Sequence, residues 1–96
     1  MEKNRILGYL GLAHRKGSVV FGTEKVLKNL ENAHQGIVFI ASDSGRNLQK
    51  KIRDKTKHHQ IRLNDLFDSH TLSQSLGRNN IKVCLLNDEA IARQIE

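Results

Sequence analysis

The stretch GIVFIA, residues 36–41, decides the fold of this 96-residue chain. It contains no polar side chain, and its β-branched residues Ile37, Val38 and Ile40 favour an extended backbone. An uninterrupted apolar strand is typical of a sheet that has helices on both faces, because neither face of such a strand meets water. We therefore expect GIVFIA to form the central strand of a layered α/β domain.

Helical and extended segments alternate on both sides of this strand. Before it, apolar residues at helical spacing predict helices over 4–15 and 23–34, with a short strand at 19–21 between them. After it, the pattern predicts a helix over 46–58 with Asp43 and Ser44 as caps, a weak strand at 61–63, a short helix over 71–76, a strand at 81–86 and a C-terminal helix capped by Asp88, with Ile91 and Ile95 facing inward. This alternation predicts an α/β fold, a three-layer α-β-α sandwich around a four-stranded mixed sheet. The spacing leaves the strand order open.

The composition is that of a single globular domain over residues 1–96. Hydrophobic residues make up 38% of the chain and charged residues 27%, which separates it from disordered sequences. No apolar run reaches ~18 residues, and no apolar segment follows the basic start, so we expect a cytoplasmic protein with no membrane partner. Cys84, the single cysteine, lies in the apolar stretch IKVCLL and is predicted to be a buried strand thiol.

The charge favours a polyanionic partner. The chain has 16 Lys and Arg against 10 Asp and Glu, a net charge of +6. Residues 63–96 hold three basic and five acidic side chains, whereas residues 45–62 hold one acidic residue, Asp54, and seven basic ones: Arg46, Lys50, Lys51, Arg53, Lys55, Lys57 and Arg62. We expect one side of the molecule to be positive, either as an ordinary solvated helix face or as a surface that follows phosphates.

The stretch GSVVFGT, residues 17–23, has the glycine spacing of a phosphate-binding P-loop but not its chemistry. Thr23 stands where the lysine that reaches the β and γ phosphates must be, and the strand lies inside the would-be loop instead of before it. We therefore do not expect nucleotide hydrolysis.

The junction at Gly22 nevertheless suits an anion. The first backbone N–H groups of a helix are unpaired, and the helix dipole leaves partial positive charge there. Lys25 and Lys28 lie on one face and tilt toward that end, where an RNA phosphate would sit. Glu24 repels phosphate and would instead meet a base edge. The alternative interpretation is an ordinary strand-to-helix turn with Thr23 as its cap.

The sequence predicts no catalytic residue, no metal site and no cofactor. His58 and His59 are adjacent and point apart on a helix, and the other histidines have no partner at ligand spacing. No serine, histidine and aspartate pattern or carboxylate pair stands out from chance. With few aromatic residues, the protein also lacks the series of exposed rings that stacks single strands, which favours recognition of RNA backbone shape.

Three motifs follow one another in a set order. Gly22-Thr23-Glu24-Lys25 with Lys28 opens the second helix, Ala41-Ser42-Asp43 ends the central strand, and the segment from Leu72 to Gly77 precedes a loop over 78–81. Together they resemble the kink-turn RNA-binding ribosomal proteins of the L-seven-Ae and L-thirty-e type, most closely the small bacterial YlxQ-type members. The resemblance spans nearly the whole chain, with Glu24-Lys25 where the family's strong binders have Asn-Glu and Ser73 where the family has a glycine.

The resemblance implies an α-β-α sandwich that binds structured RNA, either rRNA or another kink-turn-like RNA, with the ribosome as a candidate assembly and no DNA partner. It puts backbone beside phosphate at the helix start, residues 24 and 25 at tandem sheared G·A pairs, and the 78–81 loop against the kink. The RNA-binding residues expected on this basis, with one nearby arginine added, are Gly22, Thr23, Glu24, Lys25, Lys28, Arg46, Arg78, Asn79, Asn80 and Ile81.

Two other functions remain open from the sequence. The first is a protein-interaction module that keeps the fold and uses the Glu24-Lys25 patch for a protein partner. The second is an accessory RNA-binding subunit of an RNA-modifying enzyme, whose activity would come from another chain.

Overall fold

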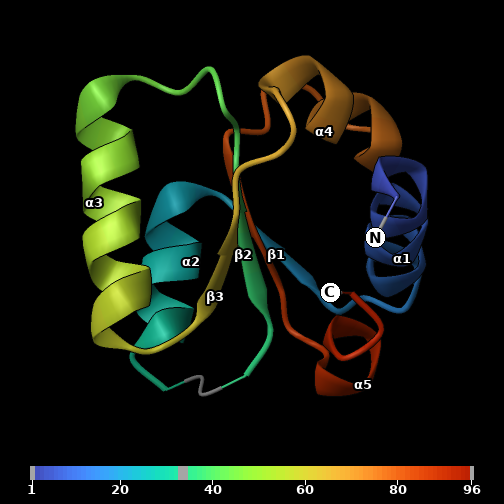
Figure 1. The fold of residues 1–96 in the computed structure, drawn as a ribbon, viewed down its shortest axis with the longest axis horizontal. Coiled ribbons are helices and arrows are strands. Elements are labelled where there is room, and N and C mark those ends of the chain that lie inside the picture. The colour runs from blue at the N-terminus through green and yellow to red at the C-terminus, as the bar shows by residue number, and fades with distance from the viewer. Residues whose placement is uncertain (1, 33–34, 96) are drawn as a thin grey trace.

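A four-stranded sheet lies between two layers of helices in the computed structural model, which describes residues 2–32 and 35–95 (Figure 1). The elements in chain order are α1 (Lys3–Arg15), β1 (Val19–Phe21), α2 (Thr23–Leu30), β2 (Ile37–Ile40), α3 (Arg46–His58), β3 (Arg62–Asn64), α4 (Ser69–Leu76), β4 (Val83–Leu86) and α5 (Glu89–Ala92). The strand order is β1-β4-β2-β3, with β4 antiparallel to both β1 and β2, and β2 parallel to β3. The predicted α-β-α sandwich with a mixed sheet is therefore confirmed.

β2 occupies the centre of the fold, as GIVFIA predicted. Ile37 and Phe39 point into the cluster formed with α1, α4 and α5, whereas Val38 and Ile40 point into the cluster formed with α2 and α3. All four side chains are at most 1% exposed. Alternate residues of one strand thus bury against opposite helix layers, which is why the strand contains no polar residue.

Several predicted boundaries and caps are corrected. α2 ends at Leu30, before the predicted end at 34, and residues 33–34 lie outside the described residues. The N-cap of α3 is Gly45, which makes no side-chain cap bond, so Asp43 and Ser44 are not caps of this helix. The carboxylate of Asp43 instead accepts a hydrogen bond from the Ser69 amide, 2.9 Å away, because the fold brings the start of α4 within its reach.

The shorter helices are fixed by aspartate caps. The Asp88 carboxylate accepts from the Ile91 amide at 3.0 Å, which confirms the predicted cap of α5. The same carboxylate accepts from Lys16 Nζ at 2.9 Å, and these bonds lower the pKa of Asp88. α4 starts before the predicted residue 71, because Asp68 accepts from the Thr71 amide and caps the helix there. That backbone bond lowers the pKa of Asp68.

Cys84 lies in the buried centre of β4, as predicted. Its side chain is fully buried, and desolvation raises the pKa of the thiol to about 12. The thiol therefore stays protonated at neutral pH and packs as an apolar group. Among residues 2–32 and 35–95, no helix has the length and apolar character needed to cross a bilayer.

Candidate nucleic-acid interface

One end of the sheet gathers the connections that carry the predicted site. The register pairs Phe21 with Cys84, Phe39 with Asn64, and Ile40 with Val83, so β1, β2 and β3 end where β4 begins. The turn into α2, the loop before α3, the turn before α4 and the 77–82 loop therefore share this end. We call this surface the sheet-end site.

Gly22 makes the turn from β1 into α2 and serves as the N-cap of that helix. Its φ of +93° and ψ of 143° are a conformation that side chains other than hydrogen rarely allow. Thr23 is the first helical residue, so the interpretation of Thr23 as the cap is wrong. In the described part of the chain, the amides of Thr23, Glu24 and Lys25 have no hydrogen-bond acceptor, which leaves three N–H groups for a ligand.

Two serines of α4 hold the loop before β4 at a single residue, Ile81. Its amide donates to Ser73 Oγ at 2.9 Å, and its carbonyl accepts from Ser69 Oγ at 2.9 Å. Gly77 ends α4 in the left-handed conformation, and Asn80 also has a positive φ of 57°. The loop is therefore a fixed turn whose shape depends on the hydroxyl at position 73, where the family resemblance expects a glycine.

The turn into α2 and this loop form one surface. Six residues line a pocket of about 150 Å³: Gly22, Thr23, Asn80, Ile81, Lys82 and Val83. An adjoining, mostly polar pocket of about 580 Å³ is lined by Asp43, Ser69, His70, Ser73, Asn79, Asn80 and Lys82. Segments about 60 positions apart thus meet here, because β1 and β4 are neighbours in the sheet.

Arg78 stands over the end of β1. The guanidinium carbon lies 3.9 Å from the centre of the Phe21 ring, and the ring of His14 meets Phe21 edge-on at 5.2 Å. This cation–π contact holds the guanidinium against the ring of Phe21, the residue before Gly22, while the Arg78 side chain stays exposed. An arginine held in this way keeps its donors available for phosphate or a base.

The remaining predicted residues sit around this centre. Glu24, Lys25 and Lys28 are exposed on the first turns of α2, and none forms an ion pair with another described residue. Arg46 is exposed at the first position of α3 at the same end of the sheet, but it lines neither pocket. Ile81 is only 7% exposed, so it offers the pocket little side-chain area.

Sequence reasoning missed Lys82, His70 and Phe21. Lys82 is exposed and lines both pockets, and its carbonyl accepts from the Ala41 amide at 2.7 Å. The available signal was that Lys82 is the one charged residue in IKVCLL, which marks where the strand leaves the core. His70 and Phe21 carry no such signal, because their place beside the loop depends on the tertiary fold.

The site contains cations, backbone amides and the carboxylates of Asp43 and Glu24, which are groups suited to binding. In the ranges 2–32 and 35–95, no three His, Cys, Asp or Glu side chains converge as metal ligands. Unpaired backbone N–H groups beside exposed lysines and an ordered arginine are the donors that proteins use for phosphate oxygens.

Comparison with known proteins identifies the family. The sequence pattern of the ribosomal protein L7Ae/L30e/S12e/Gadd45 family matches residues 4–95. The chain belongs to this family. Two relatives are both named "RNA-binding protein YlxQ": one from Enterococcus faecium is 28% identical over 93 residues, covering 97% of this chain and 89% of its own, and one from Bacillus subtilis (strain 168) is 29% identical over 86 residues, covering 90% and 86%.

A solved structure extends the family likeness to the fold. It is described as a protein with unknown function from Bacillus halodurans C, is 30% identical, and superposes with a TM-score of 0.86 over 92% of this chain and 89% of its own. The predicted family resemblance, including its YlxQ-type branch, and the predicted fold are therefore confirmed.

Proposed function

We propose that the protein is a non-enzymatic RNA-binding protein that holds structured RNA at the sheet-end site. The observation that carries this proposal is the pocket in which the Gly22 turn, with its unpaired helix amides, meets the loop residues Asn80 and Lys82. The two YlxQ relatives, whose printed names describe RNA binding, support the same function.

The proposed RNA is a kink-turn or a similarly bent duplex. A bent RNA brings two stretches of its backbone close together. The sheet-end site offers one helix start and one loop side by side, so each can contact one of these stretches. The amides of residues 23–25 would hold one phosphate, and Lys28 the next along the strand. Arg78 would lean on the other side of the kink.

Base recognition at this site rests on Glu24 and Lys25. The Glu24 carboxylate is exposed beside two lysines, so it can accept hydrogen bonds from guanine N–H groups while the lysines neutralise the adjacent phosphates. Lys25 can donate to guanine O6 or N7. We propose that this pair reads the sheared G·A pairs in place of the Asn-Glu of other family members.

The cellular setting follows from this choice of partner. We propose that the protein acts in the cytoplasm, on rRNA or another kink-turn-like RNA, and associates with the ribosome. The net charge of +6 supports attraction to such a polyanion over distance.

Fluorescence anisotropy tests the proposed RNA. The protein is titrated with a labelled kink-turn RNA and with a matched duplex that lacks the bulge, at low and near-physiological salt. We expect at least tenfold tighter binding to the kinked RNA, which corresponds to ~1.4 kcal/mol. Equal, steeply salt-dependent binding to both RNAs would contradict kink-turn recognition, and no binding to either would contradict RNA binding.

A pair of charge reversals tests the site. Lys28→Glu removes one proposed phosphate contact and should lower the slope of log K against log salt by ~0.7–0.9. Lys57→Glu, an equal charge change in the last turn of α3 at the opposite end of the sheet, is the control and should alter the slope much less. Equal effects of the two variants would mean that RNA responds to net charge and not to this site.

A further inference from the structure

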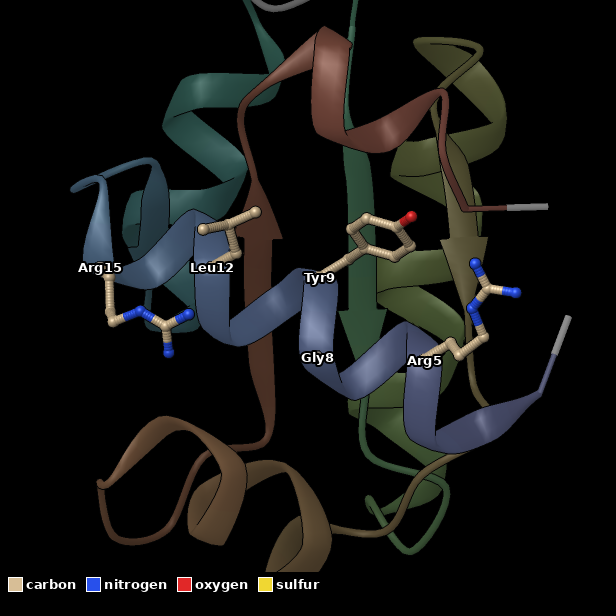
Figure 2. A pocket seen from close by; sticks show the side chains of 5 residues that line it. All are labelled: Arg5, Gly8, Tyr9, Leu12 and Arg15. Atoms are coloured by element: carbon tan, nitrogen blue, oxygen red, sulfur yellow. The ribbon is translucent and has the colours of Figure 1, made fainter.

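The outer face of α1 carries a second surface, whose chemistry differs from that of the sheet-end site. Arg5, Gly8, Tyr9, Leu12 and Arg15 line an open pocket of about 270 Å³ on this helix, and we call these five residues the α1 patch (Figure 2). They follow the spacing of one helix face, while Ile6, Leu10 and Ala13 bury the other face in the core. α1 packs on the side of the sheet opposite α2 and α3 (Figure 1).

The middle of the α1 patch is apolar and exposed. Leu12 is 40% exposed, one of two large hydrophobic side chains that are exposed in the described ranges, and Tyr9 beside it is half-buried. Figure 2 shows the Tyr9 and Leu12 side chains on the same side of the helix, with Gly8 next to Tyr9. An apolar residue of a partner would gain contact area at this point.

Gly8 leaves a gap in this face that the chain's own packing does not require. A Cβ placed at Gly8 would meet no atom within 4 Å, and the residue sits inside a regular helix. Gly11 differs, because its Cβ would lie 3.9 Å from the Ser75 carbonyl of α4. Glycine weakens a helix interior relative to alanine, so Gly8 is unfavourable for the isolated protein and is suited to the close approach of another chain.

Two arginines stand at the ends of the α1 patch. In the described residues, Arg5 and Arg15 have no carboxylate within ion-pair distance and no side-chain hydrogen bond. They are ten positions apart, which is ~15 Å along a helix. Figure 2 shows them at opposite ends of the Tyr9 and Leu12 pair. The α1 patch is therefore positive at both ends and apolar in the middle.

We propose that the α1 patch docks an acidic amphipathic helix of a partner protein. An apolar residue of that helix sits over Gly8 and contacts Tyr9 and Leu12, and carboxylates about ten residues apart pair with Arg5 and Arg15. This inference goes beyond the proposed RNA binding, which uses the end of the sheet and not the outer face of α1.

The chemistry of the α1 patch favours this occupant over two others. An RNA phosphate laid across Tyr9 and Leu12 would lose water and gain at most the Tyr9 hydroxyl as a polar partner there. A second copy docked through the same patch would bring its own arginines against Arg5 and Arg15, because a two-fold interface joins identical surfaces. A segment with an apolar centre and acidic flanks complements both the shape and the charge.

The test is a display selection of helical peptides on the immobilised wild-type protein. The library randomises the exposed positions of a 15-residue helix, in which two carboxylates ten positions apart lie ~15 Å from each other along the helix axis. We expect enriched peptides to carry an apolar centre flanked by two carboxylates about ten positions apart. Nuclear magnetic resonance with labelled protein should then show shifts at Gly8, Tyr9 and Leu12. Failure to enrich peptides, or enrichment of peptides without carboxylates, would overturn the proposal.

Matched variants identify the surface. Arg5→Glu with Arg15→Glu should weaken the selected peptides at least tenfold, and peptides with the two carboxylates changed to lysine should recover binding to this variant. Lys51→Glu with Lys55→Glu on α3 makes the same change in net charge and should leave peptide affinity unchanged. Equal losses of peptide affinity in both variants would show that only net charge matters, and this result would overturn the proposal. Loss of kink-turn RNA affinity in the arginine variant, with peptide affinity intact, would make the patch an RNA surface instead.

Discussion

The start of α2 and the outer face of α1 each present a glycine around which a Cβ would find open space, and they differ in every other respect. Gly22 is required by its own backbone, whose φ is +93°, and it exposes unpaired amides beside lysines. Gly8 has a helical backbone that any residue could adopt, and it exposes an apolar gap between arginines. The first arrangement suits phosphate and the second suits an apolar side chain, so one residue type marks two kinds of binding surface.

The sharpest test of this difference is the same substitution at both glycines, beginning with the larger effect. Gly22→Ala should lower the free energy of unfolding by ~2–3 kcal/mol, because the side chain strains the positive φ. It should also weaken kink-turn RNA binding. Urea denaturation measures the loss. Gly45→Ala is the control, since Gly45 also caps a helix but has a φ of −62°, and it should change stability by less than ~0.5 kcal/mol. Equal losses would show that the cap position, and not the backbone conformation, matters.

A second substitution tests whether RNA binding at the sheet-end site depends on the fixed 77–82 loop, which peptide binding at the α1 patch does not use. Ser73→Ala removes the acceptor of the buried Ile81 amide and should cost ~1–2 kcal/mol, with weaker RNA binding and unchanged binding of acidic peptides at α1. Ser75→Ala removes a hydroxyl that bonds within the same helix, to the Leu72 carbonyl, and is the matched control. RNA affinity that survives Ser73→Ala would mean that the loop need not be fixed.

At Gly8, the change in the free energy of unfolding on substitution by alanine should have the opposite sign. Gly8→Ala should raise the free energy of unfolding by ~1 kcal/mol, because alanine is the better helix former and its Cβ meets nothing. The same variant should weaken the selected acidic peptides by partly filling the gap, while RNA binding stays as in the wild type. Thermal denaturation and peptide titration measure the two effects. A destabilised Gly8→Ala protein would show that the glycine serves the fold after all.

Acid should separate the two helix layers by the smallest effect. The carboxylates with lowered pKa values, Asp68 and Asp88, cap α4 and α5 on the α1 side of the sheet. Because their folded pKa lies below the ordinary 3.8, they stabilise the fold above that value, and this stabilisation is lost as pH falls through the folded pKa.

Hydrogen exchange measures this prediction residue by residue. Below pH 3.8, the protected amides of Thr71 and Ile91 should exchange faster relative to that of Val26 in α2. Asp88→Asn should remove the pH dependence at Ile91, whereas Asp54→Asn on α3 should not. Parallel changes in both layers would indicate global acid unfolding instead.

The sequence predicted the elements of the fold well where local chemistry decides them. GIVFIA could be assigned because burial on both faces excludes polar residues, and the Asp88 cap could be assigned because its partner lies three residues away. Asp43 failed for the opposite reason, since a residue 26 positions away competes for its carboxylate. Strand order could not be predicted, because strands of three or four residues carry too little pattern to specify their neighbours.

The residues of the candidate site could likewise be predicted only where the local sequence or the family resemblance marks them. The glycine turn and the lysines of α2 are local, and the resemblance added the 78–81 loop. The Phe21 support of Arg78 was missed because it joins the site through the pairing of β1 with β4, and His70 was missed because only the folded loop brings it beside Asn79 and Lys82. Lys82 was missed although it is the one charged residue in IKVCLL. The α1 patch was missed because exposed residues on a helix give no periodic signal beyond that of the buried face.

The two serine bonds to Ile81 have a kinetic consequence. A loop that is already ordered loses little conformational entropy when a ligand arrives, so its closure does not slow the encounter. Association should then be set by diffusion and by the attraction between opposite charges, and it should slow as salt is added. Selectivity among RNAs would then appear in the dissociation rate, because an RNA whose bend fits the rigid sheet-end site would stay bound longer.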